Sequence, residues 1–156
     1  PATLRAEIAR LAADAAINDT LNRRLERSEF MPFAPVVAEE DADRVFKLGR
    51  AKAYAARFMT ITAHVQPGWR ERIPAVVHVD GTARPQILEE TWNPEYHRII
   101  REFERRTGIG AVLNTSFNLH GEPIVCGPAD AVDTFERSGL PHLALGHFLI
   151  SKGGQA

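Results

Sequence analysis

The sequence predicts an α+β fold built on a mixed sheet, for three reasons. Apolar residues repeat at helical spacing in the first 25 residues and again around residue 100. Short apolar runs bounded by proline and glycine lie between and after those segments, which is typical of strands. Helical and strand segments do not alternate in a regular order, so an all-parallel sheet is not expected.

Length and composition indicate one globular domain over residues 1–156. Of the 156 residues, 44% are hydrophobic and 25% are charged, as in ordinary globular proteins. The formal net charge of -1 gives no overall field that would attract nucleic acid, and no apolar run is long enough to span a bilayer. A single cysteine excludes an intramolecular disulfide and, without a signal-like N-terminus, favours a cytoplasmic location.

The first third is expected to hold a helix, an extended crossing, a strand and a second helix. Alanine, leucine and arginine predict helix from Ala2 to about Leu25, with Asn18-Asp19-Thr20 as a break that caps its second part. Two prolines favour an extended Glu29–Pro35, and Val36 begins a strand. Acidic residues favour the start of a helix over Asp43–Leu48.

Strands joined by a tight turn are predicted in the middle of the chain. The two apolar runs Phe58–Val65 and Pro74–Val79 are expected to be strands. Asp80-Gly81 is a strong turn signal, and the return strand is expected over Arg84–Leu88. Pro85 within it favours the edge of a sheet or a bulge, because proline cannot donate a ladder hydrogen bond.

A helix with clear boundary signals follows. Asn93-Pro94-Glu95 combines a capping amide, a first-turn proline and an acidic residue, and Gly108 is expected to end the helix. Four apolar residues at i, i+3, i+4 and i+7 are expected to form its buried face: Tyr96, Ile99, Ile100 and Phe103.

The C-terminal part is predicted to contain two strands and one helix. The first strand covers Gly110–Leu113, and the helix begins at Gly127-Pro128 and stops at Gly139. Leu143–Ile150 is expected to be the last strand. Three residues of the helix are expected to point inward: Ala131, Val132 and Phe135.

Small polar residues at the end of one predicted strand form the first candidate site. Asn114, Thr115, Ser116 and Asn118 directly follow the apolar run that ends at Leu113. Their hydroxyls, amides and accessible backbone N–H groups suit a phosphate or an acyl oxygen. The alternative is a hydrogen-bonded turn, since these are also ordinary turn residues.

Arginines form the second group of candidates. Arg84 follows the tight turn, where its guanidinium could bind a phosphate with two parallel hydrogen bonds; the alternative is an exposed arginine on a hairpin. Arg23, Arg24 and Arg27 form another basic group, for which a solvated helix face is the simpler interpretation.

Metal and nucleophile chemistry have weaker support. The six histidines include no His-x-x-x-His pair, and His120-Gly-Glu122 lies in a predicted loop, so no protein metal site is predicted. Cys126 precedes a predicted helix start, a position that can lower a thiol pKa. A lone cysteine after Ile124-Val125 is more often a small buried hydrophobe.

Five segments together resemble the C-terminal domain of NodU/CmcH-type carbamoyltransferases. They are Asn22–Pro35, Ile73–Gln86, Trp92–Pro94, Leu113–Asn118 and Glu122–Val125. They occur in the same order over about residues 17–152, which makes the resemblance more specific than any single motif.

This resemblance implies a YrdC-like twisted mixed sheet with flanking helices and a role in carbamoyl activation. In the family this domain is thought to combine carbamoyl phosphate with ATP, accompanied by Mg²⁺, to give carbamoyl-adenylate and pyrophosphate. By motif position, Ser116 and Arg84 would be catalytic. The residues implied to bind the nucleotide or carbamoyl-adenylate are Asn114, Thr115, Thr82, Asn118 and Arg27.

The resemblance also implies a partner. A separate acceptor-transfer domain, in cis or in trans, would pass the carbamoyl group to a hydroxyl, and that domain is absent from these 156 residues. Residues 1–16 diverge from the family's opening helix, and Leu25 and Met31 occupy positions that are usually cationic. These departures favour an alternative function as a non-catalytic binding or assembly module. The acceptor and the oligomeric state are not defined by the sequence.

Overall fold

The computed structural model describes residues 17–24 and 33–153, which fall into two compact units. Ile17 and residues 33–115 belong to the first unit, and residues 18–24 and 116–153 belong to the second. Residues 2–16 of the helix expected from Ala2 to about Leu25, and most of the extended crossing, lie outside the described residues. The single-domain assignment stays a prediction.

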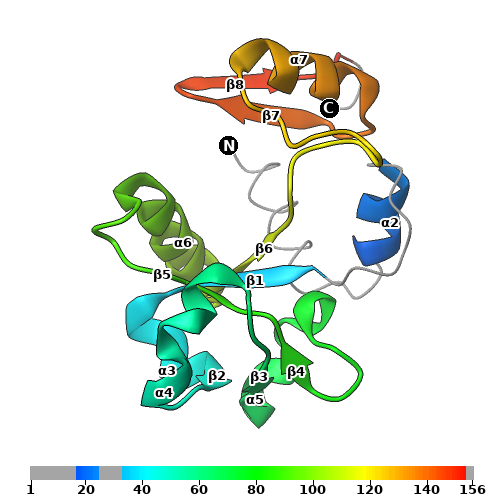
Figure 1. The fold of residues 1–156 in the computed structure, drawn as a ribbon. Coiled ribbons are helices and arrows are strands. Elements are labelled where there is room, and N and C mark those ends of the chain that lie inside the picture. Colours follow the sequence, from blue (N-terminus) through cyan, green and yellow to red (C-terminus); the bar gives the residue numbers. More distant parts are fainter. Residues whose placement is uncertain (1–16, 25–32, 154–156) are drawn as a thin grey trace. The chain divides into compact units, whose positions relative to one another are not determined.

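A mixed three-stranded sheet forms the centre of the first unit, as the sequence predicts (Figure 1). Its strand order is β5 (Gln86–Leu88), β1 (Ala34–Ala38) and β6 (Ala111–Asn114). β1 runs parallel to β5 and antiparallel to β6. All five residues of β1 are buried, because β1 is the central strand and neighbouring elements cover both of its faces.

The helix α6 (Pro94–Thr107) packs on this sheet and supplies the core. Ile100 is completely buried against Val36, Ala38 and Leu88. The predicted helix boundaries are confirmed: the Asn93 side chain accepts a hydrogen bond from the backbone N–H of Tyr96, and the backbone of the glycine at position 108 is left-handed.

One predicted core position of α6 is wrong. Ile99 is 60% exposed, whereas His97 is buried and its Nε2 lies 3.0 Å from a carboxylate oxygen of Glu40. The buried stripe is centred on Ile100 and Phe103. Ile99 lies one residue, about 100° of helical rotation, away from Ile100.

The first unit contains a second sheet, which is antiparallel. It consists of β2 (Phe46–Lys47), β3 (Ala63–Val65) and β4 (Thr82–Ala83). Pro85 separates β4 from β5, so two strands consecutive in the chain belong to different sheets. The Pro85 side chain is fully buried. Among the described strands β5 lies at an edge of its sheet, as expected, but it begins at Gln86, so the return strand is shorter than the predicted Arg84–Leu88 and Pro85 lies outside it.

Two of the expected strands are shorter or absent. The region from Phe58 to Val65 begins with the end of a 3₁₀ helix, η2 (Ala55–Phe58), and a left-handed Met59, and only β3 is strand. The region from Pro74 to Val79 contains a 3₁₀ helix, η3 (Pro74–Val76). A proline in the first turn favours that conformation, because its φ is already close to the helical value.

The helix expected over Asp43–Leu48 is also shorter. A 3₁₀ turn, η1 (Glu39–Asp41), leads into α3 (Ala42–Val45), and the chain then becomes extended because Phe46 pairs with Val65. The described part of the unit also contains two further single-turn helices, α4 (Arg50–Ala53) and α5 (Pro67–Arg70).

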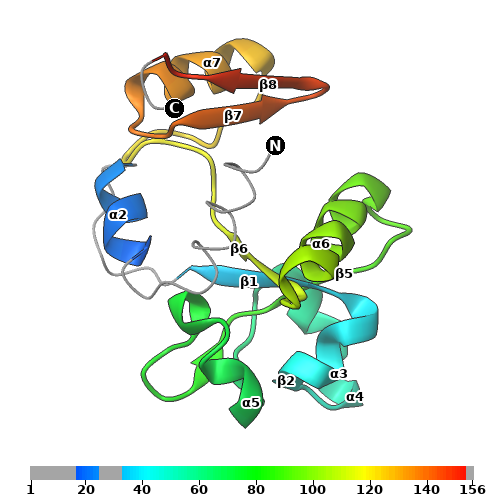
Figure 2. The same cartoon turned by 180° about the vertical axis from the view of Figure 1, so that it is seen from behind.

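The second unit contains α7 (Pro128–Arg137) and a hairpin of β7 (His142–Leu145) and β8 (Phe148–Ser151). The single strand predicted over Leu143–Ile150 is therefore wrong, because Gly146, with φ 56°, reverses the chain. The helix α7 lies along the hairpin in opposite views (Figures 1 and 2). Of the three predicted inward residues of α7, Ala131 and Phe135 are buried and Val132 is half-buried.

The remaining described helix is α2 (Ile17–Arg24), and it continues through Asn18-Asp19-Thr20. The break expected there is therefore not observed.

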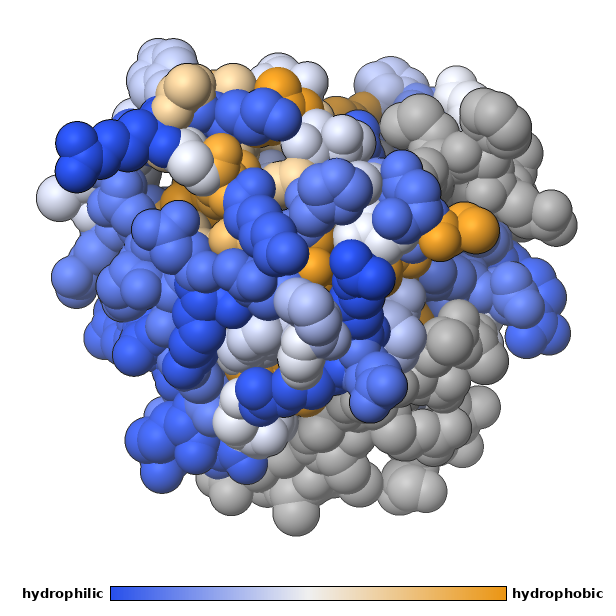
Figure 3. Space-filling model, turned by 90° about the horizontal axis from the view of Figure 1, so that it is seen from below, coloured by the Kyte–Doolittle hydropathy of each residue, from blue (hydrophilic) through white to orange (hydrophobic). Residues whose placement is uncertain are grey.

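Figure 3 shows one face on which hydrophilic side chains cover most of the described surface, with smaller hydrophobic areas between them. None of the described helices has the length and apolar character needed to cross a membrane.

Candidate functional site

The predicted site residues are divided between the two units. Thr82, Arg84, Asn114 and Thr115 belong to the first unit. Ser116 and Asn118 belong to the second unit. Arg27 lies outside the described residues. Each group is therefore considered within its own unit.

A hydrogen-bonded turn precedes Arg84. The backbone N–H of Gly81 donates to the carbonyl of His78 at 2.8 Å, and the N–H of His78 donates to the carbonyl of Thr82 at 2.7 Å. Gly81 has φ 77°, a left-handed value that favours glycine. A Cβ at this position would lie 2.8 Å from Cζ of Arg70, at the end of a flexible side chain that can shift, so the left-handed backbone is the stronger reason for glycine here.

Side chains inside this turn bind one another. The Thr82 hydroxyl donates to Oδ1 of Asp80 at 2.7 Å and lies 2.9 Å from Nδ1 of His78. Hydrogen bonds from the hydroxyl and the backbone N–H of Thr82 lower the pKa of the Asp80 carboxyl. Thr82 is only 8% exposed, and its described side-chain contacts are with other residues of the turn, which they stabilise. Its role in nucleotide binding stays a prediction.

Arg84 is half-buried and follows the turn by two residues. Its neighbours on both sides, Ala83 and Pro85, are buried, so its backbone is firmly placed. Nδ2 of Asn114 donates to Oε1 of Gln86 at 2.7 Å. The structure thus brings the polar end of β6 to the segment that carries Arg84.

Gln86 contacts a candidate site residue, Asn114, and the sequence analysis did not single it out. Its side chain fixes the orientation of the Asn114 amide, because the amide nitrogen can donate to Gln86 only in one orientation. The available signal was a polar residue at the start of the otherwise apolar strand β5.

In the second unit, Ser116 and Asn118 begin the segment from Ser116 to Cys126, named here the 116–126 loop. Ser116 is half-buried. Nδ2 of Asn118 donates to the backbone carbonyls of Leu119 and Glu122, at 3.1 and 2.9 Å. These bonds hold the loop in shape, and the implied contact of Asn118 with the nucleotide stays a prediction.

Glu122 was considered above with His120 as a metal site, and its carboxylate is ion-paired. Its two oxygens bind Nη1 and Nη2 of Arg137 at 2.6 and 2.8 Å. The hydrogen bonds from Arg137 lower the pKa of Glu122. Within residues 17–24 and 33–153, no group of three histidine, cysteine, aspartate or glutamate residues is placed to hold a metal ion.

Cys126 is exposed, so the expectation of a small buried hydrophobe is wrong. Its backbone N–H and that of Gly127 donate to Oδ2 of Asp130, at 3.2 and 2.9 Å. These bonds hold the backbone of Cys126 beside the N-terminus of α7, with its side chain exposed.

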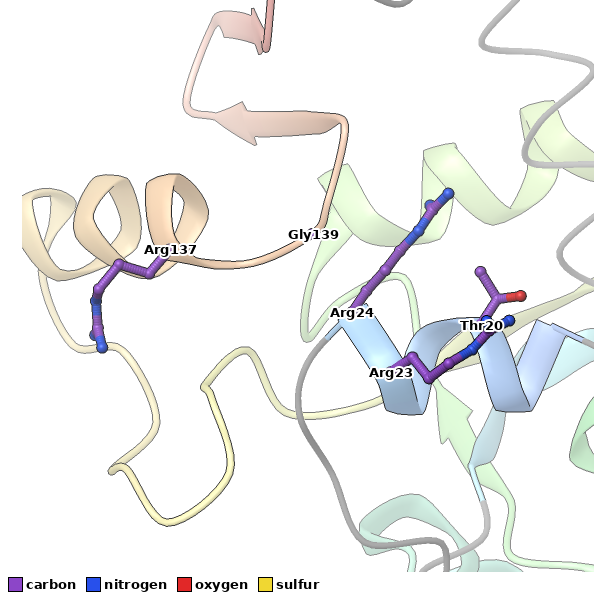
Figure 4. Close-up of a pocket in the computed structure, with 5 residues that line it drawn as sticks. All are labelled: Thr20, Arg23, Arg24, Arg137 and Gly139. Atoms are coloured by element: carbon purple, nitrogen blue, oxygen red, sulfur yellow. The ribbon is translucent and has the colours of Figure 1, made fainter.

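A cavity of about 430 Å³ in the second unit is lined by Thr20, Arg23, Arg24, Arg137 and Gly139. Figure 4 shows that the three guanidinium groups point in different directions. Arg137 is paired with Glu122, and Nε of Arg23 donates to the carbonyl of Asp19. The three arginines therefore do not converge on one anion. A second cavity, of about 650 Å³, lies between the 116–126 loop and α7.

The family profile and the relatives described below match most of this chain. A family profile described as "Carbamoyltransferase C-terminus" matches residues 5–152. The nodulation protein NolNO of Sinorhizobium fredii is 42% identical over 139 residues, which are 88% of this chain and 20% of that protein. Nodulation protein U of Azorhizobium caulinodans is 36% identical over 110 residues, 70% of this chain and 19% of that protein.

A relative named as an enzyme also matches. The 3'-hydroxymethylcephem-O-carbamoyltransferase of Amycolatopsis lactamdurans is 33% identical over 132 residues, which cover 85% of this chain and 24% of that protein. The chain thus spans only about a fifth to a quarter of the length of these relatives.

Proposed function

This chain belongs to the carbamoyltransferase C-terminal family, and from that premise we propose that it activates a carbamoyl group with ATP for transfer to a hydroxyl. The printed name of one relative, an O-carbamoyltransferase, supports the transfer. The observation in the structure that carries the proposal is the 2.7 Å bond from Asn114 to Gln86, which links the polar end of β6 to the Arg84 segment.

The proposed activation step is transfer of the adenylyl group of ATP to the carbamoyl group. An oxygen of the carbamoyl group attacks the α-phosphorus of ATP, the bond from that phosphorus to the β-phosphate oxygen breaks, and pyrophosphate leaves. Starting from carbamoyl phosphate, one water is consumed and orthophosphate is also released. Adenylation of this kind depends mainly on positioning and on charge neutralisation.

The residues of this chain suit that chemistry. A half-buried guanidinium at Arg84 can bind phosphate oxygens with charge-assisted hydrogen bonds. Thr115, Ser116 and the neighbouring backbone supply small donors to oxygens of the carbamoyl-adenylate. Mg²⁺ would enter with the ATP phosphates, which ordinarily provide much of its coordination, and would neutralise their charge.

The remaining length of the relatives supports a second component. We expect an acceptor-transfer domain, in the same chain or in another, to receive the activated carbamoyl group and to bind the hydroxyl acceptor. Each relative described above contains several times more residues than the matched region, which leaves ample length for such a domain.

Pyrophosphate release tests the proposal directly. It is measured with ATP, Mg²⁺ and carbamoyl phosphate, using this chain alone and with an acceptor-domain protein, and again without carbamoyl phosphate. Ser116→Ala and Arg84→Ala should each lower the rate about 10²- to 10³-fold, the usual cost of losing one transition-state donor. Arg105→Gln, which removes an exposed arginine from α6, is the matched control. Absence of both pyrophosphate release and calorimetric ATP binding would refute the enzymatic function.

A second function, as a non-catalytic binding or assembly module, is favoured by Leu25 and Met31 at positions that are usually cationic. It predicts a stable complex with an acceptor-domain protein and no adenylation. Introducing Leu25→Lys and Met31→Arg together should then create pyrophosphate release where the natural chain has none. Turnover by the unmodified chain excludes this alternative.

A further inference from the structure

The 116–126 loop connects β6 to α7 and contains its own hydrogen-bond network. Besides the two bonds from the Asn118 amide, the N–H of Glu122 donates to the carbonyl of Leu119, and the N–H of Val125 donates to the carbonyl of Phe117, both at 3.1 Å. These bonds close the loop on itself. Glu122 is thus bonded directly to Asn118, which lies two residues from Ser116.

Two carboxylates attach this loop to α7. Glu122 forms the two-bond fork with Arg137 in the last turn of the helix, and Asp130 in the first turn accepts the N–H groups of Cys126 and Gly127. The loop is thus held at both ends of α7, by contacts that are directional.

Asp133 orients Arg137 for its role. Its Oδ2 accepts from Nε of Arg137 at 3.0 Å and lies 2.8 Å from Nη2, one turn earlier on the same helix. The guanidinium is planar, so a carboxylate that holds Nε and Nη2 fixes the plane in which Nη1 and Nη2 also meet Glu122. Asp133 and Glu122 thus hold the Arg137 guanidinium from two sides.

Apolar burial contributes less to the shape of this loop. Leu119 is buried, but Pro123 is exposed and Ile124 is 65% exposed. Polar contacts therefore determine the conformation of the segment that begins with Ser116.

We propose that Arg137 is a positioning residue, which holds the 116–126 loop through Glu122 and Asn118 and thereby sets the place of Ser116. This inference rests on the proposed function of Ser116. In this role Arg137 acts through Glu122 and the loop. Its loss changes the chemistry by releasing the loop, and the expected kinetic effect is on kcat.

The test combines hydrogen exchange with kinetics in Arg137→Gln, Arg137→Lys and Arg105→Gln. The last is a matched control, because Arg105 forms an equivalent fork with Glu102 at 2.8 and 2.9 Å but holds no loop. In Arg137→Gln, the backbone amides of Glu122 and Val125 should exchange faster, and kcat should fall about 10- to 100-fold with KM for ATP nearly unchanged. Arg137→Lys should show a smaller change in both exchange and kcat than Arg137→Gln, because lysine keeps the positive charge. Some change should remain, because lysine cannot form the two-bond fork.

Hydrogen exchange and kinetics together distinguish the positioning role of Arg137 from the proposed function of the chain. Unchanged exchange at Glu122 and Val125 in Arg137→Gln overturns the inference whatever the kinetics show. Faster exchange with an unchanged kcat also overturns it, because the loop then moves without affecting the chemistry. If the natural chain releases no pyrophosphate, the proposed function fails, and exchange alone still decides whether Arg137 holds the loop.

Discussion

The two compact units differ in how deeply they bury their apolar side chains. In the first unit, Val36, Val37, Val45 and Ile100 are completely buried around the strands and α6. In the second, the most buried apolar side chain of α7, Phe135, is 4% exposed, and all four residues of β8 are exposed. The first unit thus combines a deeply buried apolar core with an ion-pair network that joins Asp41 and Glu104 to Arg44 and Arg101. The second unit buries its apolar side chains less deeply, and its loop is held to α7 by the Glu122–Arg137 fork and by the carboxylate of Asp130. Local stability and its dependence on pH should differ accordingly.

The largest expected effect is the loss of a core side chain in the first unit. Ile100→Ala should lower the free energy of unfolding by about 2–5 kcal/mol, because it removes buried methyl groups and leaves a cavity. Ile99→Ala is the matched control on the same helix. Its side chain is mostly exposed, so its effect should be within about 0.5 kcal/mol. Urea denaturation compares the two, and equal losses would contradict the core described here.

A smaller effect is expected where α2 meets the chain after α7 in the second unit. A Cβ at Gly139 would lie 2.9 Å from Cγ and 3.2 Å from Cα of Arg24. Gly139→Ala should therefore cost about 1–3 kcal/mol through overpacking. Gly153→Ala, with no atom within 4 Å of the added Cβ, is the control. If thermal unfolding does not distinguish the two variants, the close approach is not real.

The cap of α6 gives a third, more modest test in the first unit. Asn93→Ala removes the side-chain oxygen that accepts from the Tyr96 N–H, and should cost about 1 kcal/mol. Arg98→Ala, at an exposed position of the same helix, should change the free energy by less than about 0.5 kcal/mol. A cap effect no larger than this control would remove the evidence for local helix capping.

The smallest effect is expected at the exposed carboxylate of Asp130, and it tests the pH dependence of the second unit. Hydrogen bonds from the N–H groups of Gly127 and Cys126 lower the pKa of Asp130 below its ordinary 3.8. Its contribution is therefore complete above that value and is lost as the pH falls through the lowered pKa. Asp130→Asn should lower the melting temperature at pH 7, and the difference should shrink at pH 2.

Glu136→Gln, at an exposed position on the same helix, is the control for this pH series. A deficit in Asp130→Asn that persists unchanged in acid would contradict a contribution from the charged carboxylate.

Local signals predicted the fold where they were unambiguous. The Asn93-Pro94 start and the Gly108 end of α6 were correct, because capping depends on residues next to each other in the chain. Pro74–Val79 was predicted as strand from its apolar composition, but strand formation needs a partner, and the segment forms a 3₁₀ turn instead. Ile99 was misassigned because helical spacing alone does not fix the centre of the buried stripe.

Sequence patterns were also insufficient to predict the contacts of the candidate site. Motifs drew attention to Arg84 and Asn114, yet the contact that links their segments passes through Gln86, 28 residues from Asn114. Likewise, Glu122 and Arg137 are 15 residues apart, and no local pattern pairs them. Contacts between distant residues depend on the tertiary arrangement, which composition and periodicity do not encode.

The passage from one sheet to the other at Ala83–Gln86 also makes position 84 useful for design. The strands on either side belong to separately hydrogen-bonded sheets, and the flanking Ala83 and Pro85 are buried. The backbone there is thus fixed from both directions, while the side chain remains half-buried. A library of substitutions at this position would sample different ligand chemistries on nearly one backbone, as enzyme engineering requires.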